Sequence, residues 1–135
     1  MPQTGARLVA INPYFLVDDV HQSAEYYREV LGFSFDQFWG EPPAFVMVKR
    51  DAIMIMLREP AAPDGTSVVQ PNSPRLKHAF DAYLRVSEVD ALYAEFSRKG
   101  AKLLYEPCDR PHDCREFEVE DCNGYRLCFG QDLLA

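Results

Sequence analysis

The chain contains one pattern twice. Residues 14–32 read as a strand, a tight corner and an amphipathic helix that ends in glycine, and residues 83–100 follow the same plan. Val17 of the first copy aligns with Val86 of the second. A repeat of this length is too long for a solenoid unit and too short for a free domain, because so small a unit buries too little surface alone. The sequence therefore predicts two similar modules that share one hydrophobic core.

Each copy is followed by three strand-like segments, so each module is predicted to have the order βαβββ. The predicted strands are residues 8–17, 33–39, 44–49 and 53–58 in the first module, and residues 80–86, 102–106, 116–120 and 125–129 in the second. Module 1 spans about residues 8–58, a proline-rich linker residues 59–75, and module 2 about residues 79–131, within a single domain of residues 1–135. The predicted fold class is α+β. The two half-sheets are expected to form one cupped mixed sheet with the helices on its outer face.

The ends of both helices carry residues suited to them. Asp18 and Asp19 are N-cap residues for the first helix, and Ser87 is the predicted N-cap of the second. Gly32 and Gly100 follow the helices and can take the left-handed conformation that ends a helix.

Composition narrows the classes of partner. The net charge of −7 argues against a nucleic-acid-binding protein, which normally carries a basic face, and it permits a cationic ligand. The longest apolar run is far shorter than the roughly 20 residues that cross a bilayer, and the first residues lack a long apolar signal core. We therefore expect a soluble cytoplasmic protein that acts on neither nucleic acid nor membrane.

The four cysteines, Cys108, Cys114, Cys122 and Cys128, include no C-x-x-C pair. Disulfides are not expected in a reducing cytosol. A zinc cluster of Cys108, His112 and Cys114 is conceivable, but the spacing matches no common zinc pattern. Buried or strand cysteines are the favoured interpretation.

Two stretches resemble a known family. Residues 19–35, DVHQSAEYYREVLGFSF, resemble the D-x-x-x-x-x-x-F-Y-x-x-x-L-G-F motif of the vicinal oxygen chelate superfamily, which includes glyoxalases, extradiol dioxygenases and bleomycin-resistance proteins. The closing segments R-E-F, D-C-N-G-Y and F-G-Q resemble the bleomycin-resistance branch, with Cys122 in place of a proline. The resemblance implies the paired βαβββ fold and leaves the activity open, because one fold hosts many functions.

In metal-dependent members of that family, four strand positions carry the ligands, and the resemblance maps them to Asn12, Met56, Asp81 and Cys128. A hard divalent ion needs several oxygen or imidazole ligands, and of these four only Asp81 is a normal hard ligand. We therefore predict no metal at these positions and no cofactor.

The three histidines, His21, His78 and His112, are expected to be surface residues. The sequence contains no Gly-rich phosphate loop, no G-x-S-x-G elbow and no H-E-x-x-H motif.

Without a metal, the cup is predicted to be a pocket for an organic ligand, cationic or aromatic. Its predicted lining is Asn12, Tyr14, Trp39, Met54, Met56, Asp81, Tyr83, Arg85, Arg126 and Cys128. The leading hypothesis is a metal-free protein of the bleomycin-resistance type that sequesters such a ligand without altering it. In the alternative, purely structural interpretation, these side chains fill the cup, and Asp81 pairs with Arg126.

Two further functions stay open. A lyase, isomerase or dioxygenase would use Asp81 as a general base or Cys128 as a nucleophile whose pKa a nearby cation lowers. A regulatory protein would dock a partner through exposed sheet edges. A homodimer is expected, because modules of this family often build their cups across two chains. Whether the cup forms within one chain or between two is left open by the sequence.

Overall fold

The structure, a computed structural model, describes residues 5–61, 64–76 and 79–134. It confirms the α+β class and the two βαβββ modules, and the second module has one additional short strand. The first module consists of β1 (Tyr14–Leu16), α1 (Val20–Glu29), β2 (Phe38–Trp39), β3 (Phe45–Arg50) and β4 (Ile53–Arg58). The second consists of β5 (Ala82–Arg85), α2 (Val89–Arg98), β6 (Lys102–Leu103), β7 (Cys108–Asp109), β8 (Cys114–Glu120) and β9 (Arg126–Asp132).

Both modules have the same sheet topology. The first sheet has the order β1-β4-β3-β2, and the second has the order β5-β9-β8-β6, with β7 also paired to β8. The first strand of each module runs parallel to the last strand, and the remaining pairs are antiparallel. Within the described residues the half-sheets are two separate sheets rather than the single cupped sheet that the sequence suggested.

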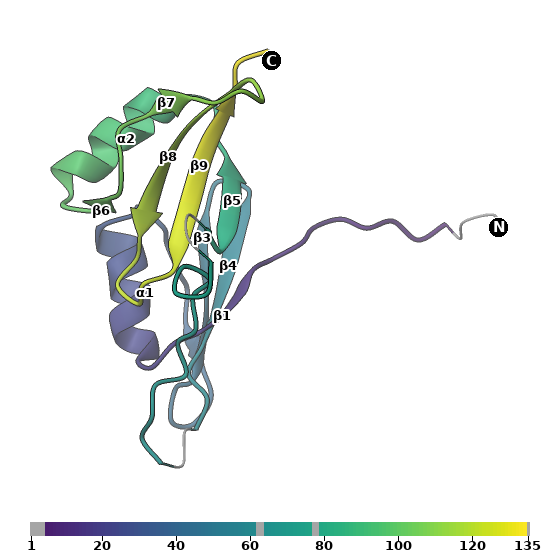
Figure 1. Cartoon of the computed structure of the whole chain (residues 1–135). Coiled ribbons are helices and arrows are strands. Elements are labelled where there is room, and N and C mark those ends of the chain that lie inside the picture. Colours follow the sequence, from purple (N-terminus) through teal and green to yellow (C-terminus); the bar gives the residue numbers. More distant parts are fainter. Residues whose placement is uncertain (1–4, 62–63, 77–78, 135) are drawn as a thin grey trace.

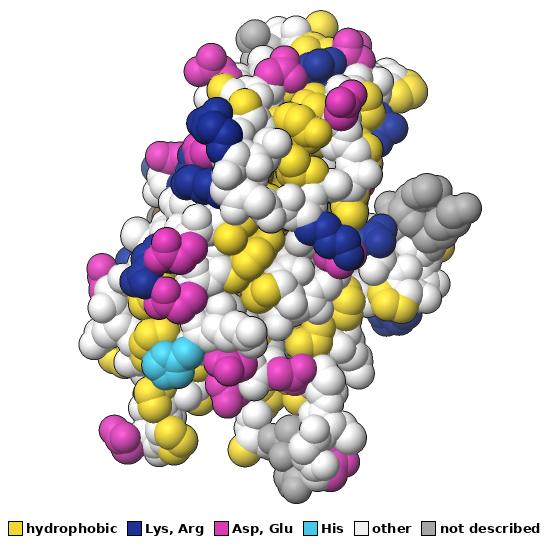
Figure 2. Space-filling view, turned by 90° about the vertical axis from the view of Figure 1, so that its left-hand side faces the viewer, with side chains coloured by type: hydrophobic (Ala, Val, Ile, Leu, Met, Phe, Trp, Pro, Cys, Tyr) yellow, Lys and Arg dark blue, Asp and Glu magenta, His cyan; other side chains and the backbone are white. Residues whose placement is uncertain are grey.

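Both helices lie on one side of the molecule, and the N-terminal arm runs away from the body on the other side (Figure 1). Seen from the helix side, acidic and basic side chains are interspersed with apolar ones (Figure 2). No helix among the described residues is long and apolar enough to span a membrane.

The first strand is much shorter than predicted. Pairing with β4 begins at the Pro13 carbonyl, which accepts a hydrogen bond from the Met56 N–H at 2.9 Å. Residues 5–12 instead extend outward as the arm seen in Figure 1. Leu8, Val9 and Ile11 on this arm are 104%, 92% and 95% exposed. The arm therefore presents apolar side chains without cover from the described part of the chain.

Two other strands differ from their prediction. The second strand of module 1 was predicted from residue 33 but begins at Phe38, and upstream of it only an isolated bridge joins Ser34 to Lys49. The short strand β7 was not predicted. Edge strands such as these are held by few ladder bonds, so their periodicity carries little signal.

A residue at the C-terminal end of the last strand of each module, Glu59 just after β4 and Gln131 near the end of β9, binds the start of that module's helix. The Glu59 carboxylate accepts a hydrogen bond from the Val20 N–H, and the Gln131 side chain accepts one from the Val89 N–H, each at 2.9 Å. Asp19 is the predicted N-cap of α1 and accepts from the Gln22 N–H.

The prediction that Ser87 caps α2 was wrong. The N-cap is Glu88, and its side chain makes no capping bond. The Gln131 side chain satisfies one free amide of this helix end instead, and a free helix-end amide needs such a partner when it is buried.

The two modules share one hydrophobic core. On β1, Phe15 points toward this core and stacks on Tyr125, with ring centroids 4.4 Å apart. The Tyr125 hydroxyl donates a 2.6 Å hydrogen bond to the Leu16 carbonyl. The Tyr27 hydroxyl donates to the Asp121 carboxylate at 2.7 Å, in a fully buried contact between α1 and the turn that joins β8 to β9.

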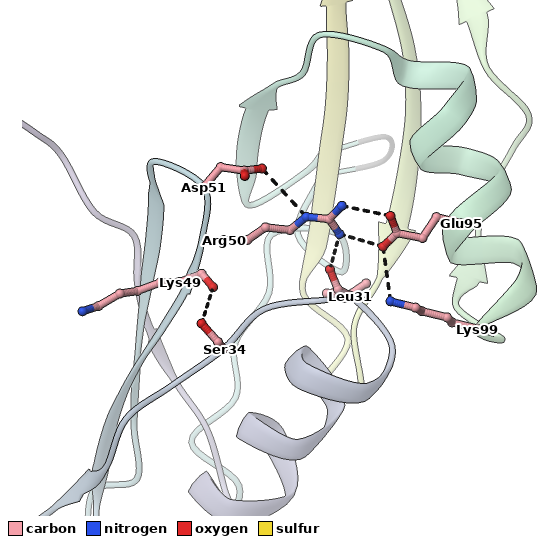
Figure 3. A network of polar contacts seen from close by, with 7 residues as sticks. All are labelled: Leu31, Ser34, Lys49, Arg50, Asp51, Glu95 and Lys99. Carbon is pink, nitrogen blue, oxygen red and sulfur yellow. Dashed lines mark hydrogen bonds and ion pairs between the residues drawn. The ribbon is translucent and has the colours of Figure 1, made fainter.

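An ion pair also joins the modules just beyond the C-terminal end of α1. The Arg50 guanidinium binds both oxygens of Glu95, at 2.7 and 2.9 Å, and also donates to the Leu31 carbonyl (Figure 3). This contact holds the pKa of Glu95 below its ordinary value. Gly32, with φ of 76°, allows the close approach, because a Cβ there would lie 2.6 Å from a guanidinium nitrogen.

We expect Asp121→Asn to remove a pH dependence of stability. Burial raises the pKa of Asp121 from 3.8 to about 6. The protonated form therefore favours the folded state: its contribution is complete below about pH 4 and is lost as the pH rises through about 6. A change of this size corresponds to at most about 3 kcal/mol of unfolding free energy. Asparagine offers a similar set of hydrogen bonds without ionising.

Urea unfolding of both proteins between about pH 4 and about pH 7 measures the effect. The unfolding free energy of the variant relative to that of the parent protein should grow with pH. A difference that stays constant over this interval would show that Asp121 does not titrate there.

Candidate functional site

The face of the second sheet opposite α2 carries two buried carboxylates. On β8, Phe117 and Val119 point toward the hydrophobic core, and Phe117 contacts the rings of α2. Because strand side chains alternate, Glu116 and Glu118 point to the other face. They are only 6% and 8% exposed. We call the surrounding group the acidic face, which consists of Tyr83, Tyr105, Arg110, His112, Glu116 and Glu118.

Glu116 is held by three side chains. The Tyr83 hydroxyl donates to its Oε2 atom at 2.8 Å, and the His112 Nε2 atom lies 2.8 Å from the same oxygen. The Nε atom of Arg110 lies 3.5 Å from its Oε1 atom. Burial alone would raise the pKa of Glu116, but the bonds from His112 and Tyr83 bring it below its ordinary value. Glu116 is therefore a buried and ionised carboxylate.

Glu118 has a different environment. Its Oε2 atom accepts a 2.7 Å hydrogen bond from the Tyr105 hydroxyl, and the Arg110 guanidinium lies over the Tyr105 ring at 5.0 Å. Burial and the Glu118 charge raise the pKa of Tyr105. Within the described residues, Glu118 forms no ion pair, so a buried carboxylate faces this surface without a cation of its own.

Cys128 lies opposite Glu118 in the pairing of β8 with β9, and Tyr83 lies beside it on β5. Burial, together with the Glu116 and Glu118 charges, raises the pKa of the Cys128 thiol. A raised pKa favours the thiol over the reactive thiolate. The environment of Cys128 thus disfavours the nucleophile that the sequence suggested.

Asp81 serves the backbone. Its two carboxylate oxygens accept hydrogen bonds from the N–H groups of Asn72 and Arg126, at 2.8 and 2.9 Å. The contact with Arg126 is therefore to its main chain, and the Arg126 guanidinium lies 3.7 Å from Glu120 instead. Asp81 ties the linker to β9, and these bonds compete with the general-base role that the sequence suggested.

The other predicted lining residues lie in separate places. Tyr14 and Asp81 share a groove of about 530 Å³ with Leu16 and Tyr125. Met56 lies opposite Tyr14 in the first sheet, and Met54 points to the same face.

Three more predicted lining residues lie apart from this groove. Trp39 is exposed beside a small hollow on β2, Arg85 pairs with Asp132, and Asn12 lies on the arm. The structure thus distributes the predicted lining over the arm and the faces of two sheets that point away from the helices.

The four metal positions implied by the family resemblance do not suit a hard metal ion in this chain. Asp81 already binds two backbone amides, and Cys128 is a buried thiol with a raised pKa. Met56 offers only a thioether, and Asn12 a neutral amide.

Sequence reasoning missed most of the acidic face. The available signal was the alternation of glutamate with apolar residues over residues 116–120, which places the glutamates on one face of a strand. His112 was expected to be a surface residue and is exposed, but it also contacts Glu116. The expectation for His78 falls outside the described residues.

The chain matches a known protein family and is similar to several solved structures. A family model described as Glyoxalase/Bleomycin resistance protein/Dioxygenase superfamily matches residues 8–129. Among solved structures, the chain is similar to a glyoxalase-related enzyme from Clostridium phytofermentans, with a TM-score of 0.74, 14% identity, and 96% of this chain and 99% of that chain covered.

Two other solved structures are similar. A bleomycin-binding protein from bleomycin-producing Streptomyces verticillus, complexed with copper(II)-bleomycin, gives a TM-score of 0.64 at 20% identity, with 93% and 96% of the two chains covered. A lactoylglutathione lyase from Agrobacterium tumefaciens gives 0.66 at 19% identity, with 93% and 95% covered. No curated protein sequence gives a significant match. At these identities the likeness is one of fold.

We expect Gly130→Ala to disrupt the Tyr83–Glu116 hydrogen bond. The Tyr83 hydroxyl crosses Gly130 to reach Glu116, and an added Cβ would overlap it. Overpacking of this kind typically costs about 1–3 kcal/mol of unfolding free energy. In a Tyr83→Ala background the same substitution should cost much less, because the overlapping atoms are gone.

Urea unfolding of the four proteins of this double-mutant cycle measures the coupling. Additive free-energy changes would mean that Tyr83 does not lie over Gly130.

Proposed function

The chain belongs to the Glyoxalase/Bleomycin resistance protein/Dioxygenase superfamily, and we propose that it is a binding protein that sequesters an organic cation with an aromatic part. The ligand lies on the acidic face of the second sheet, and no metal at the four family positions takes part. The protein acts in the cytoplasm, where its free cysteines stay reduced.

One observation carries the proposal: the buried Glu118 carboxylate has no cationic partner within the described residues. Burying a charge is costly unless a partner compensates it. A ligand cation at Glu118 would supply that partner. The Tyr105 and Tyr83 rings beside the two glutamates offer aromatic surface, on which planar or cationic groups pack well.

The comparisons and the charge support the same class of ligand. One structural relative was solved as a bleomycin-binding protein with copper(II)-bleomycin. The net charge of −7 favours cationic over anionic ligands. The enzymatic alternative has less support, because the Asp81 oxygens bind backbone amides and the pKa of Cys128 is raised.

We further propose that the arm packs on a second copy of the chain. Leu8, Val9 and Ile11 are almost fully exposed on it, and burial of such side chains typically stabilises an interface. A partner at this arm would also cover Asn12. In this homodimer, the cup is completed by two faces from different chains. One is the face of the first sheet that carries Met54 and Met56, and the other is the acidic face of the partner chain's second sheet.

We expect Glu118→Gln to weaken ligand binding at least about tenfold, which is about 1.4 kcal/mol. The substitution keeps the shape and the Tyr105 hydrogen bond but removes the charge that attracts the cation. Isothermal titration calorimetry with bleomycin-like glycopeptides and planar aromatic cations measures the affinity.

Glu106→Gln is the matched control for this titration, because it removes the same charge from an exposed site. Equal affinities of the Glu118→Gln variant and the parent protein, or no binding across the panel, would overturn the proposal.

We expect light scattering to show that the parent protein is a dimer. The double substitution Leu8→Ser with Ile11→Ser should raise the dissociation constant of this dimer at least about tenfold, because about 1.4 kcal/mol or more of apolar contact is lost. Leu76→Ser is the control, because Leu76 is an exposed leucine just after the linker and away from the arm in sequence. A monomeric parent protein, or equal effects of both changes, would refute a role for the arm.

A further inference from the structure

We propose that His112, Cys114 and Glu116 form a binding site for a zinc-like divalent cation at the start of β8 in the second sheet. This site is separate from the four positions that the family resemblance implies. It does not depend on the organic ligand of the proposed function.

Local chain geometry assembles the three side chains. They alternate in sequence at the start of β8, so strand geometry directs Cys114 and Glu116 to one face. Asp113 has a positive φ of 61°, which turns the chain just before the strand and brings His112 back over Glu116. One potential ligand atom from each residue lies within 4.8 Å of the other two.

These distances leave little to adjust. A tetrahedral zinc ion with bonds of about 2.0–2.3 Å holds its ligand atoms about 3.3–3.8 Å apart. Side-chain rotations that close the group by about 1 Å would therefore suffice for coordination. Cys114 and Glu116 are buried, whereas the His112 side chain is 59% exposed and leaves a path for the ion.

The donor set selects the kind of ion. A sulfur, an imidazole nitrogen and a carboxylate oxygen suit Zn²⁺ or Co²⁺ and disfavour Mg²⁺ or Ca²⁺, which prefer oxygen alone. On binding, the ion replaces the thiol proton of Cys114, and that proton passes to the buffer. Three protein ligands leave a fourth position for water or an added ligand.

Two neighbouring side chains, Tyr83 and Arg110, would orient the Glu116 carboxylate toward the ion. Tyr83 donates a hydrogen bond to Glu116 Oε2, and Arg110 lies at the other oxygen. An ion between His112 and Glu116 would replace their direct contact and leave both of these groups in place around the carboxylate, as outer contacts that orient a metal ligand do. The positive Arg110 opposes the ion, but its side chain is partly exposed and stacks on Tyr105, which lessens that repulsion.

The proposed site differs by one residue from the zinc cluster considered from the sequence. Cys108 was grouped there with His112 and Cys114, but its sulfur lies 3.9 Å from the Glu116 carbonyl oxygen. The Glu116 carboxylate takes its place as third ligand. The spacing H-x-C-x-E is the periodicity of a strand, which common zinc patterns do not use.

Titration of the reduced full chain with Co²⁺ alone tests the site. We expect saturation at one equivalent, with a thiolate-to-cobalt charge-transfer absorption in the near ultraviolet. Cys114→Ser should abolish this absorption, and His112→Gln should weaken Co²⁺ binding at least about tenfold, because each removes one of three ligands. Cys122→Ser and His21→Gln are the controls, since both residues are exposed and lie outside the cluster.

Absence of the charge-transfer absorption from the parent protein would overturn the proposal. So would its loss in Cys122→Ser, or unchanged affinity in His112→Gln. Because His112 is exposed, His112→Gln keeps the test decisive even where Cys114→Ser folds poorly. No organic ligand is present, so failure here leaves the proposed function standing, and failure of the ligand panel leaves this site standing.

Discussion

The buried carboxylate of Asp121 holds the two modules together at the point on which the acidic face depends. It accepts hydrogen bonds from the Tyr27 hydroxyl on α1 and from the N–H groups of Asn123 and Tyr125 in its own turn. That turn joins β8 to β9, the strands that carry the two buried glutamates and Cys128. A charge desolvated to this extent needs all its partners, so the hydrogen bond from Tyr27 fixes the turn against α1. All three partners come from the stretches that carry the family resemblance, which gives those motifs a structural reason.

The repeated pattern was enough to predict the two-module architecture. Each copy combines the two-residue alternation of a strand with the 3.6-residue period of a helix, and loops show neither. The bounds of β4 agree with the predicted segment of residues 53–58, where alternation is strict. Where local pattern and tertiary contact compete, the prediction failed. Pro13 has no N–H to give, and the chain leaves the sheet before it. The start of α2 is bound by Gln131, far along the chain, and no local capping rule could find that contact.

The site was less predictable than the fold for a related reason. Alternation tells which side chains share a face of a strand, but not which partners meet them there. Asp81 was a reasonable choice of acid–base group until two backbone amides proved to bind its oxygens. Glu118 carried the better signal, but a row of glutamates is usually a solvated face. Only the folded chain shows that Glu116 and Glu118 in this row are buried.

The two buried glutamates divide the acidic face by the partners they already have. Glu116 is surrounded by Tyr83, His112 and Arg110, and a ligand cation there would have to compete with a guanidinium. Glu118 has one hydroxyl and no such competitor within the described residues. An organic cation, whose attraction is mainly electrostatic, therefore gains more at Glu118. A metal ion gains bonds from His112 and Cys114 that an ammonium group cannot form, so it gains more at Glu116. One strand can thus carry two sites that select their ligands by different chemistry.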